Sequence, residues 1–278
     1  MFKNRAFTII AVFLVLFVRT SLADELEINT DRCQSSADLD VKINACTWLL
    51  GSGHLTKEGF ANVRYFLGGA YLDQGQYDRA IQEYDKVIKI APDSDGAYNN
   101  RGIAYQQKGL YDRAIEDYDQ AIKLNPNEPI TYSMRGNAYY GKQVYDRAIQ
   151  DHDRAIKLNP EYESAYFNRG VAFLAAKLWE WAIEDFTKVI ELKPDEADAY
   201  NHRGYANAAK RLHDQAIQDF SQAIKLNPQH TTAYVYRGRV YELLGREGEA
   251  VRDFKHQYEM GSRSEWLVQR LRELGALN

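Results

Sequence analysis

The chain has 278 residues and carries 35 Lys and Arg side chains against 39 Asp and Glu side chains, so its formal net charge is −4 at pH 7. Three of the basic residues and none of the acidic ones lie in the first 23 residues, so the remainder carries a formal charge of −7. Because nucleic-acid binding relies on Lys and Arg to neutralise phosphates, this balance argues against a nucleic-acid partner.

The N-terminus has the pattern of a secretory signal peptide. Lys3 and Arg5 precede an uncharged run over residues 6–18, and small residues occupy the first and third places of Ser21-Leu22-Ala23. We therefore predict cleavage after Ala23 and a periplasmic or secreted protein. The run of 13 residues is shorter than the roughly 20 that a bilayer-spanning helix needs. An uncleaved membrane anchor is the alternative.

Two cysteines, Cys33 and Cys46, follow the predicted signal peptide. An even number of cysteines in an exported chain favours a disulfide, because oxidising compartments let such bonds persist. Closing a loop of this size would stabilise the fold by about 3 kcal/mol. A redox-active pair is an alternative. A metal site is a weaker interpretation, because two thiols without nearby histidines fall short of four ligands.

A fixed period of 34 residues organises most of the chain, and it is marked by Pro92, Pro126, Pro160, Pro194 and Pro228. A constant period of this length indicates one helical unit that is copied and stacked, because a single unit cannot bury its own apolar face. Six repeats follow from this register. Their ranges are 61–94, 95–128, 129–162, 163–196, 197–230 and 231–264.

The second repeat shows the pattern most fully. Its marker residues are Tyr98, Arg101, Gly102, Tyr105, Ala114, Tyr118, Ala121 and Pro126. This pattern resembles the tetratricopeptide repeat. The glycine recurs at Gly68, Gly102, Gly136, Gly170, Gly204 and Gly238, and an alanine recurs at Ala80, Ala114, Ala148, Ala182, Ala216 and Ala250. Residues without bulk at these places let two crossing helices approach closely.

The resemblance implies an all-α fold, an α-α solenoid or superhelix of about six helix-turn-helix repeats with a cap at each end. Within a repeat, proline ends the second helix, because it lacks an N–H and disfavours helix for the residue before it. Residues 24–60 are expected to form an N-terminal cap pinned by the disulfide, since residues 43–50 resemble the lead-in helix of exported bacterial proteins of this family. The array is expected to be continuous.

Residues 265–278 are expected to form the C-terminal capping helix. Trp266, Leu267, Leu271 and Leu274 lie along one face of an amphipathic helix over 265–277. Terminal repeats need such a cap to cover their apolar side. A membrane-surface helix is the alternative, but the polar face mixes acidic and basic residues instead of being basic.

One place departs from the family pattern. The seventh residue of each repeat, usually Leu in the family, is Leu67 in the first repeat and arginine in the others, and the twenty-third residue changes in parallel from Glu83 to aspartate. An interior arginine needs a carboxylate partner, which it can bind in bidentate fashion. We predict an Arg–Asp ladder between the helices of neighbouring repeats. Its members are Arg101, Arg135, Arg169, Arg203, Arg237, Asp117, Asp151, Asp185, Asp219 and Asp253. A row of arginines that binds an anionic ligand is the alternative.

The resemblance also implies that the first helix of each repeat lines a concave groove through its second, fifth, sixth, ninth, twelfth and thirteenth residues. At the fifth, sixth and ninth places the groove is aromatic, amide-rich and nearly neutral, which suits an extended or helical segment of a partner protein. The predicted binding residues are Tyr65, Phe66, Asn99, Asn100, Ile103, Met134, Asn137, Phe167, Asn168, Val171, Asn201, His202, Tyr205 and Tyr236. Several of the aromatic residues would instead pack between repeats.

Little in the sequence indicates catalysis. His152 between two aspartates looks like part of a triad, but it stands where other repeats have an aromatic residue, and substitution for that residue explains it. Asp198 and His202 are four residues apart and could begin a metal or proton site, but two ligands are too few. No phosphate-binding loop or nucleophile elbow is present. We expect no enzyme, no cofactor and no metal.

The sequence therefore favours a non-catalytic scaffold or adaptor of the bacterial periplasm or envelope, which binds a segment of another exported protein in its groove. The bacterial assignment rests on the family resemblance. The alternative is a binder of a small envelope ligand, such as a glycan, a peptidoglycan fragment or a lipid, through the groove aromatics. An envelope hydrolase is a third class that no residue supports. The identity of the partner and self-association stay open.

Overall fold

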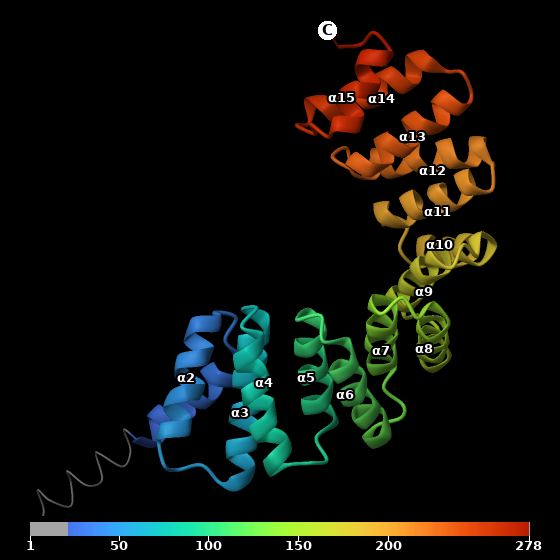
Figure 1. Ribbon diagram of the computed structural model, residues 1–278. Helices are drawn as coiled ribbons and strands as arrows, with labels where there is room; N and C mark the ends of the chain where they lie inside the picture. The colour runs from blue at the N-terminus through green and yellow to red at the C-terminus, as the bar shows by residue number, and fades with distance from the viewer. Residues whose placement is uncertain (1–21, 278) are drawn as a thin grey trace, which may run out of the picture. The chain divides into compact units, whose positions relative to one another are not determined.

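The computed structural model describes residues 22–277, and every regular element in that range is a helix. Of the predicted signal peptide, only Leu22 and Ala23 fall within the described residues, at the start of a helix over 22–35. The numbered helices that follow are α2 (Leu39–Gly51), α3 (Lys57–Asp73), α4 (Tyr77–Ile90), α5 (Asp95–Gln107), α6 (Tyr111–Leu124), α7 (Pro129–Gly141), α8 (Tyr145–Leu158), α9 (Glu163–Ala175), α10 (Trp179–Leu192), α11 (Ala197–Ala209), α12 (His213–Leu226), α13 (Thr231–Leu243), α14 (Glu247–Glu259) and α15 (Glu265–Glu273) (Figure 1). None of the described helices combines the length and the apolar character needed to cross a membrane.

The contacts along the chain group into two compact units, one ending at Asn127 and the other beginning at Glu128. The N-terminal unit contains α2 and the hairpins α3/α4 and α5/α6. The C-terminal unit contains the hairpins α7/α8, α9/α10, α11/α12 and α13/α14, followed by α15. Within each unit every hairpin packs on the next one. The predicted fold class, an all-α helical-repeat solenoid, is confirmed.

Helix boundaries follow the 34-residue register closely. The first helices of repeats two to six begin at the predicted first residue of each repeat. The first repeat differs, because α3 begins at Lys57 and not at Ala61. Glu58 stands where later repeats have proline, so no residue disfavours helix there. The Thr56 side chain instead caps α3 by accepting a hydrogen bond from the backbone N–H of Gly59.

An aromatic ring packed on a glycine holds each hairpin together. In every repeat, the ring of the second helix lies against the repeated glycine of the first helix, and a Cβ at that glycine would be 2.5–3.0 Å from a ring atom. The pairs are Gly68/Tyr84, Gly102/Tyr118, Gly136/His152, Gly170/Phe186, Gly204/Phe220 and Gly238/Phe254. The repeated alanine is fully buried in each of the six repeats. Glycine is therefore required because the ring occupies the space of a side chain.

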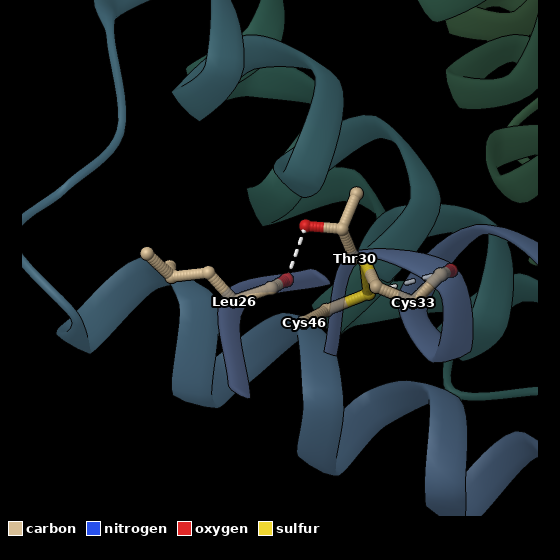
Figure 2. Close-up of a disulfide and its surroundings, with 4 residues drawn as sticks. All are labelled: Leu26, Thr30, Cys33 and Cys46. Carbon is tan, nitrogen blue, oxygen red and sulfur yellow. Dashed lines mark hydrogen bonds between the residues drawn. A yellow bond between two sulfur atoms is a disulfide. The ribbon is translucent and has the colours of Figure 1, made fainter. Parts of the chain in front are cut away.

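The predicted disulfide between Cys33 and Cys46 is present and lies in the N-terminal cap. Figure 2 shows the bond beside the helix over 22–35, where the Thr30 hydroxyl donates a hydrogen bond of 2.7 Å to the Leu26 carbonyl. Both cysteines are fully buried, in one cluster with Leu49 of α2 and Leu67 of α3. The disulfide thus links the two helices of the cap, and its sulfur atoms lie in the apolar cluster through which the cap packs on the first repeat.

The C-terminal cap is shorter than predicted. Helix α15 ends at Glu273 and not at residue 277, because Gly275 adopts a positive φ of 65°. The backbone N–H groups of Gly275 and Ala276 then bond to the carbonyls of Arg272 and Leu271, which is a typical glycine-terminated helix end. Leu267 and Leu271 are fully buried against Phe254, so the predicted apolar face does cover the last hairpin.

We expect Gly170→Ala and Gly248→Ala to change stability in opposite directions. At Gly170 a Cβ would meet the Phe186 ring at 2.9 Å, and overpacking of this kind costs roughly 1–3 kcal/mol. Gly248 is exposed on α14 with no atom within 4 Å, so alanine there should stabilise by about 0.4–1 kcal/mol. Urea unfolding followed by circular dichroism measures both. Equal effects at the two positions would contradict the ring-on-glycine account.

Candidate functional site

Among the groove residues predicted in the N-terminal unit, Tyr65 makes the best-defined contacts. The Tyr65 ring of α3 lies edge-on to the rings of Phe66 and Tyr84, at 5.9 Å between centroids in both cases. Its hydroxyl accepts a hydrogen bond of 3.0 Å from Asn100 Nδ2 of α5. Asn99 and Ile103 are half-buried on the same helix. Tyr65 therefore joins the first helices of two successive repeats, which is a packing role.

The C-terminal unit contains a pocket of about 410 Å³ along the first helices of its four repeats, and we call it the groove pocket. Five of the predicted residues line it, namely Val171, Asn201, His202, Tyr205 and Tyr236. The lining also includes Tyr140, Leu174, Ala175, Asp198 and Thr232, which were not among the predicted site residues. These five stand at the second, twelfth or thirteenth place of their repeats. The family's groove positions therefore contained the signal that would have found them.

Four predicted residues, Met134, Asn137, Phe167 and Asn168, do not line the groove pocket. The Phe167 ring lies edge-on to Phe186, with centroids 5.6 Å apart, and edge-on to His202 at 5.3 Å. Phe186 is fully buried. Phe167 thus packs between Phe186 of the hairpin core and His202, which lines the groove pocket.

Aromatic rings form one side of the groove pocket. The Tyr205 ring of α11 packs against Tyr236 of α13, with centroids 5.2 Å apart, and lies edge-on to Trp179 at 6.2 Å. Tyr236 in turn packs on Phe220, a buried core ring. Tyr205 remains 39% exposed, so its ring packs on neighbouring aromatic residues and is still accessible to a ligand in the pocket.

The polar groups of the pocket are already partly engaged. His230 Nε2 lies 3.0 Å from a carboxylate oxygen of Asp198, while His230 Nδ1 accepts from the backbone N–H of Ala233 at the start of α13. His202 Nδ1 contacts the backbone carbonyl of Asp198 at 2.7 Å. Asn201 Oδ1 is buried without a hydrogen-bond partner. Asp198 and His202 therefore do not converge on one point, and the described residues contain no metal-binding cluster of three or more His, Cys, Asp or Glu side chains.

The predicted Arg–Asp pairs all form, but each one lies within a single repeat and not between neighbours. In the second repeat, Arg101 of α5 donates from Nε and Nη2 to the two carboxylate oxygens of Asp117 of α6, at 2.8 and 2.6 Å. Arg135, Arg169, Arg203 and Arg237 bind Asp151, Asp185, Asp219 and Asp253 through the same two nitrogens. Burial raises the pKa of the Asp117 and Asp185 carboxyls, and the arginine hydrogen bonds oppose that rise.

The third guanidinium nitrogen makes the contact between repeats. Arg101 Nη1 donates to Asp85 of α4 at 2.6 Å, and Arg169 Nη1 donates to Asp153 of α8. Arg203 and Arg237 reach hydroxyl groups at the equivalent place, Thr187 Oγ1 at 3.1 Å and Ser221 Oγ at 2.9 Å. Each of the five arginines also lies over the tyrosine three residues before it, 5.5–5.7 Å from the ring centroid. These arginines are fully engaged in the fold, which disfavours an anion-binding row.

The first repeat shows why Leu67 replaces arginine. Its neighbour is the apolar N-terminal cap, and Leu67 is buried with Cys33, Cys46 and Leu49. A guanidinium there would face the disulfide cluster. Glu83, which stands in place of the aspartate, instead receives hydrogen bonds of 2.6 Å from Arg64 and Lys86.

His152 occupies the place of the hairpin ring and has no access to solvent. It is 0% exposed, its Nδ1 lies 3.3 Å from Ser133 Oγ, and its Nε2 has no hydrogen-bond partner. Burial, with a smaller contribution from the positive charge of Arg169, lowers the pKa of His152 to about 4. A neutral imidazole in the hairpin core serves as an aromatic substitute, as the sequence indicated.

We expect Arg169→Leu to destabilise the protein more than the double variant Arg169→Leu/Asp185→Leu. The single change leaves the Asp185 side chain, which is only 5% exposed, without its bidentate partner. Breaking a buried pair in this way costs about 3–5 kcal/mol, whereas replacing both partners by apolar residues is often nearly neutral. Urea unfolding of both variants measures the difference. A double variant at least as unstable as the single one would contradict the assigned pairing.

We expect His152→Phe to remove part of the acid sensitivity of the protein. The unfolded chain binds a proton at this histidine near pH 6.5, whereas the folded protein binds it only near pH 4. Stability therefore falls as the pH decreases through this window, by up to about 3 kcal/mol. Urea unfolding at pH 7.5 and pH 4.5 measures the loss, and the Phe variant should show less of it. The converse variant, Phe186→His, should gain acid sensitivity, and no change in either variant would contradict the assignment.

Models of the tetratricopeptide repeat match most of the array. One model, described as TPR repeat, matches residues 68–109 and 136–176, and a second, described as tetratricopeptide repeat, matches residues 96–128, 164–196 and 197–230. Together they cover residues 68–128 and 136–230, more than half of the chain. A search of the curated proteins found no match.

Solved structures of repeat proteins match as well. A crystal structure of MamA is 30% identical, with 59% of this chain and 95% of MamA covered and a TM-score of 0.55. YrrB, described as a TPR protein with an unusual peptide-binding site, is 22% identical over 69% of this chain and 96% of YrrB, with a TM-score of 0.56. Pseudomonas aeruginosa pilF is 19% identical over 78% of this chain and 98% of pilF, with a TM-score of 0.67. Repeats of this kind indicate a protein–protein interaction scaffold, and the chain belongs to the tetratricopeptide repeat family.

Proposed function

We propose that the chain is a non-catalytic scaffold of the bacterial periplasm or envelope whose groove pocket binds a segment of another exported protein. The observation that carries the proposal is the groove pocket itself. It lies along successive first helices, so a segment running across it meets several repeats in turn. Multiple weak contacts of this kind suit an extended chain better than a compact one.

The lining chemistry supports a peptide as the occupant. Tyr205, Tyr236 and Leu174 offer rigid apolar area, and aromatic residues supply a large share of binding energy at protein interfaces. Asn201 contributes an amide whose oxygen lacks a partner, and Asp198 adds one carboxylate that is 60% exposed. Apolar contacts together with a few polar groups would fix the register of a bound backbone.

Two independent features support export. The sequence before Asp24 has the pattern of a signal peptide, and a disulfide between Cys33 and Cys46 links the helix over 22–35 to α2 within the cap. Disulfides persist in oxidising compartments and are rare in the cytosol. The bacterial assignment is supported by the lead-in segment over residues 43–50, which resembles that of exported bacterial proteins of this family.

The non-catalytic assignment is supported by the roles of the histidines. His152 is buried beneath Gly136, where no substrate reaches it. His230 joins Asp198 to the N-terminus of α13, and its Nδ1 lone pair is directed at a backbone N–H. His230 therefore serves as the N-cap of α13.

We expect the double variant Tyr140→Ala/Tyr205→Ala to lose captured partner protein. Both side chains are more than a third exposed in the groove pocket, so their removal should reduce binding with little loss of stability. Trp181→Ala is the matched control, because Trp181 is 56% exposed on α10 outside the pocket. Each protein is purified in its mature form from the native envelope, and the eluates are identified by mass spectrometry.

The same preparation tests the competing interpretations. A partner retained by Trp181→Ala and lost from the tyrosine variant supports the scaffold, whereas equal capture by all three proteins would overturn it. Retained partners with loss of binding to a peptidoglycan fragment in the tyrosine variant would favour the small-ligand alternative. The intact mass of the wild type tests export. We expect the mass of a chain that begins at Asp24 and contains the disulfide, which is two hydrogens less than the mass of the reduced chain.

A further inference from the structure

A second hollow of about 620 Å³ lies between α13 and the capping helix α15. Its lining includes Arg239 and Leu243 of α13 and Trp266 of α15. At the fifth, sixth and ninth places of the six repeats, Arg239 is the one strong charge. We call Arg239, Leu243 and Trp266 the C-terminal anchor surface.

Arg239 stacks on the capping helix and, within the described part of the chain, lacks a carboxylate partner. Its guanidinium lies 4.4 Å from the centroid of the Trp266 ring, and that ring is itself held edge-on by Phe254 at 5.4 Å. Among the described residues, no Asp or Glu side chain forms an ion pair with Arg239. Stacking covers one face of the guanidinium and leaves the N–H groups at its edge free to bind an oxyanion.

The other charged groups of this surface pair with one another. Arg270 Nε donates to Glu242 at 2.5 Å, and Arg270 Nη1 donates to Glu273 at 2.7 Å. Two glutamates therefore share one arginine and contribute a local negative charge, while the charge of Arg239 is separate and held over the indole. An anionic group that contacts Arg239 must approach from the side of Leu243 and Trp266, where the surface is apolar.

That apolar side is open. Leu243 is 74% exposed, the highest fraction among the exposed large apolar side chains of the described residues, and Trp266 is 39% exposed. Tyr236, Arg239 and Leu243 are spaced at i, i+3 and i+7 on α13, so they share one face of the helix. Because Tyr236 also lines the groove pocket, the anchor surface continues the same binding face toward the C-terminus.

We propose that the C-terminal anchor surface binds an Asp or Glu side chain that stands beside a large apolar residue in the partner segment. The carboxylate pairs with the edge of Arg239, and the apolar neighbour lies on Leu243 and Trp266. The open surface around Leu243 lets the bound chain pass across, so the carboxylate belongs to a side chain within the segment. This inference rests on the proposed function, because the same segment occupies the groove pocket.

The test begins with a random-peptide library displayed on phage and selected on the mature chain, from which one synthetic peptide is taken for fluorescence-polarisation titrations. Arg239→Gln should weaken its binding by about tenfold or more, because a charge-assisted hydrogen bond is lost. Arg246→Gln is the matched control and should leave binding unchanged. Arg246 also lies over an aromatic ring, Tyr241 at 4.5 Å, but it pairs with Glu249 outside both hollows.

A change in the peptide completes a double-mutant cycle with Arg239→Gln. Replacing its acidic residue by the amide should weaken binding to the wild type by the same factor and should cause no further loss with Arg239→Gln. An unchanged affinity of the wild type for the amide peptide, or of Arg239→Gln for the original peptide, overturns the inference. Sensitivity to amidation of the peptide C-terminus alone would assign the carboxylate to a chain end and would also overturn it.

Other outcomes separate this inference from the proposed function. Selected peptides without an acidic residue, bound by Arg239→Gln as well as by the wild type but lost with Tyr205→Ala, would overturn the anchor and keep the groove. A library that yields no binder would contradict both. A dimer in sedimentation that is abolished by Leu243→Glu would assign the surface to a second copy of the chain and overturn the inference.

Discussion

Within each of the two units, the contact on which the junctions between repeats depend is a single guanidinium that binds three groups. Two nitrogens of Arg101 hold Asp117 within its own repeat, and the third reaches Asp85 in the repeat before it. Because the guanidinium is planar and rigid, these bonds fix the angle at which one hairpin meets the next. Within the C-terminal unit the first helices are thereby kept side by side, and the residues that line the groove pocket are presented on one face.

The ends of the array follow from the same requirement. In repeat one, Leu67 stands in place of the arginine and packs with Cys33, Cys46 and Leu49 of the cap. In repeat six, Lys255 stands where the second helices of earlier repeats carry Asp, Thr or Ser. The helix that follows repeat six is the cap α15, which packs on the last hairpin through Leu267 and Leu271 and not through a structural arginine, so position 255 needs no acceptor. Terminal repeats of stacked arrays depart from the internal pattern for this reason.

The periodic features of the fold were predictable from the sequence, whereas the features set by one particular neighbour were not. The periodic proline indicated where the first helices α5, α7, α9, α11 and α13 begin, but the early start of α3 depends on Thr56 and the early end of α15 on Gly275. In the groove, the repeat position indicated which side chains face inward. It could not show that Phe167 and Tyr65 rest on core rings while Tyr205 stays open, since that depends on side-chain contacts between repeats.

The arginine contacts also decide how much charge the protein can offer to a partner. Arg101, Arg169, Arg203 and Arg237 use all three kinds of guanidinium nitrogen in the fold, and each stacks on a tyrosine. A count of basic residues therefore overstates the positive charge available near the first helices. Arg239 differs because it stands two residues beyond the structural arginine and stacks on the cap instead of pairing with aspartate. Such an isolated charge adds specificity to a groove that is otherwise aromatic and amide-rich. A competing segment that carries its carboxylate at another position would leave that carboxylate unpaired.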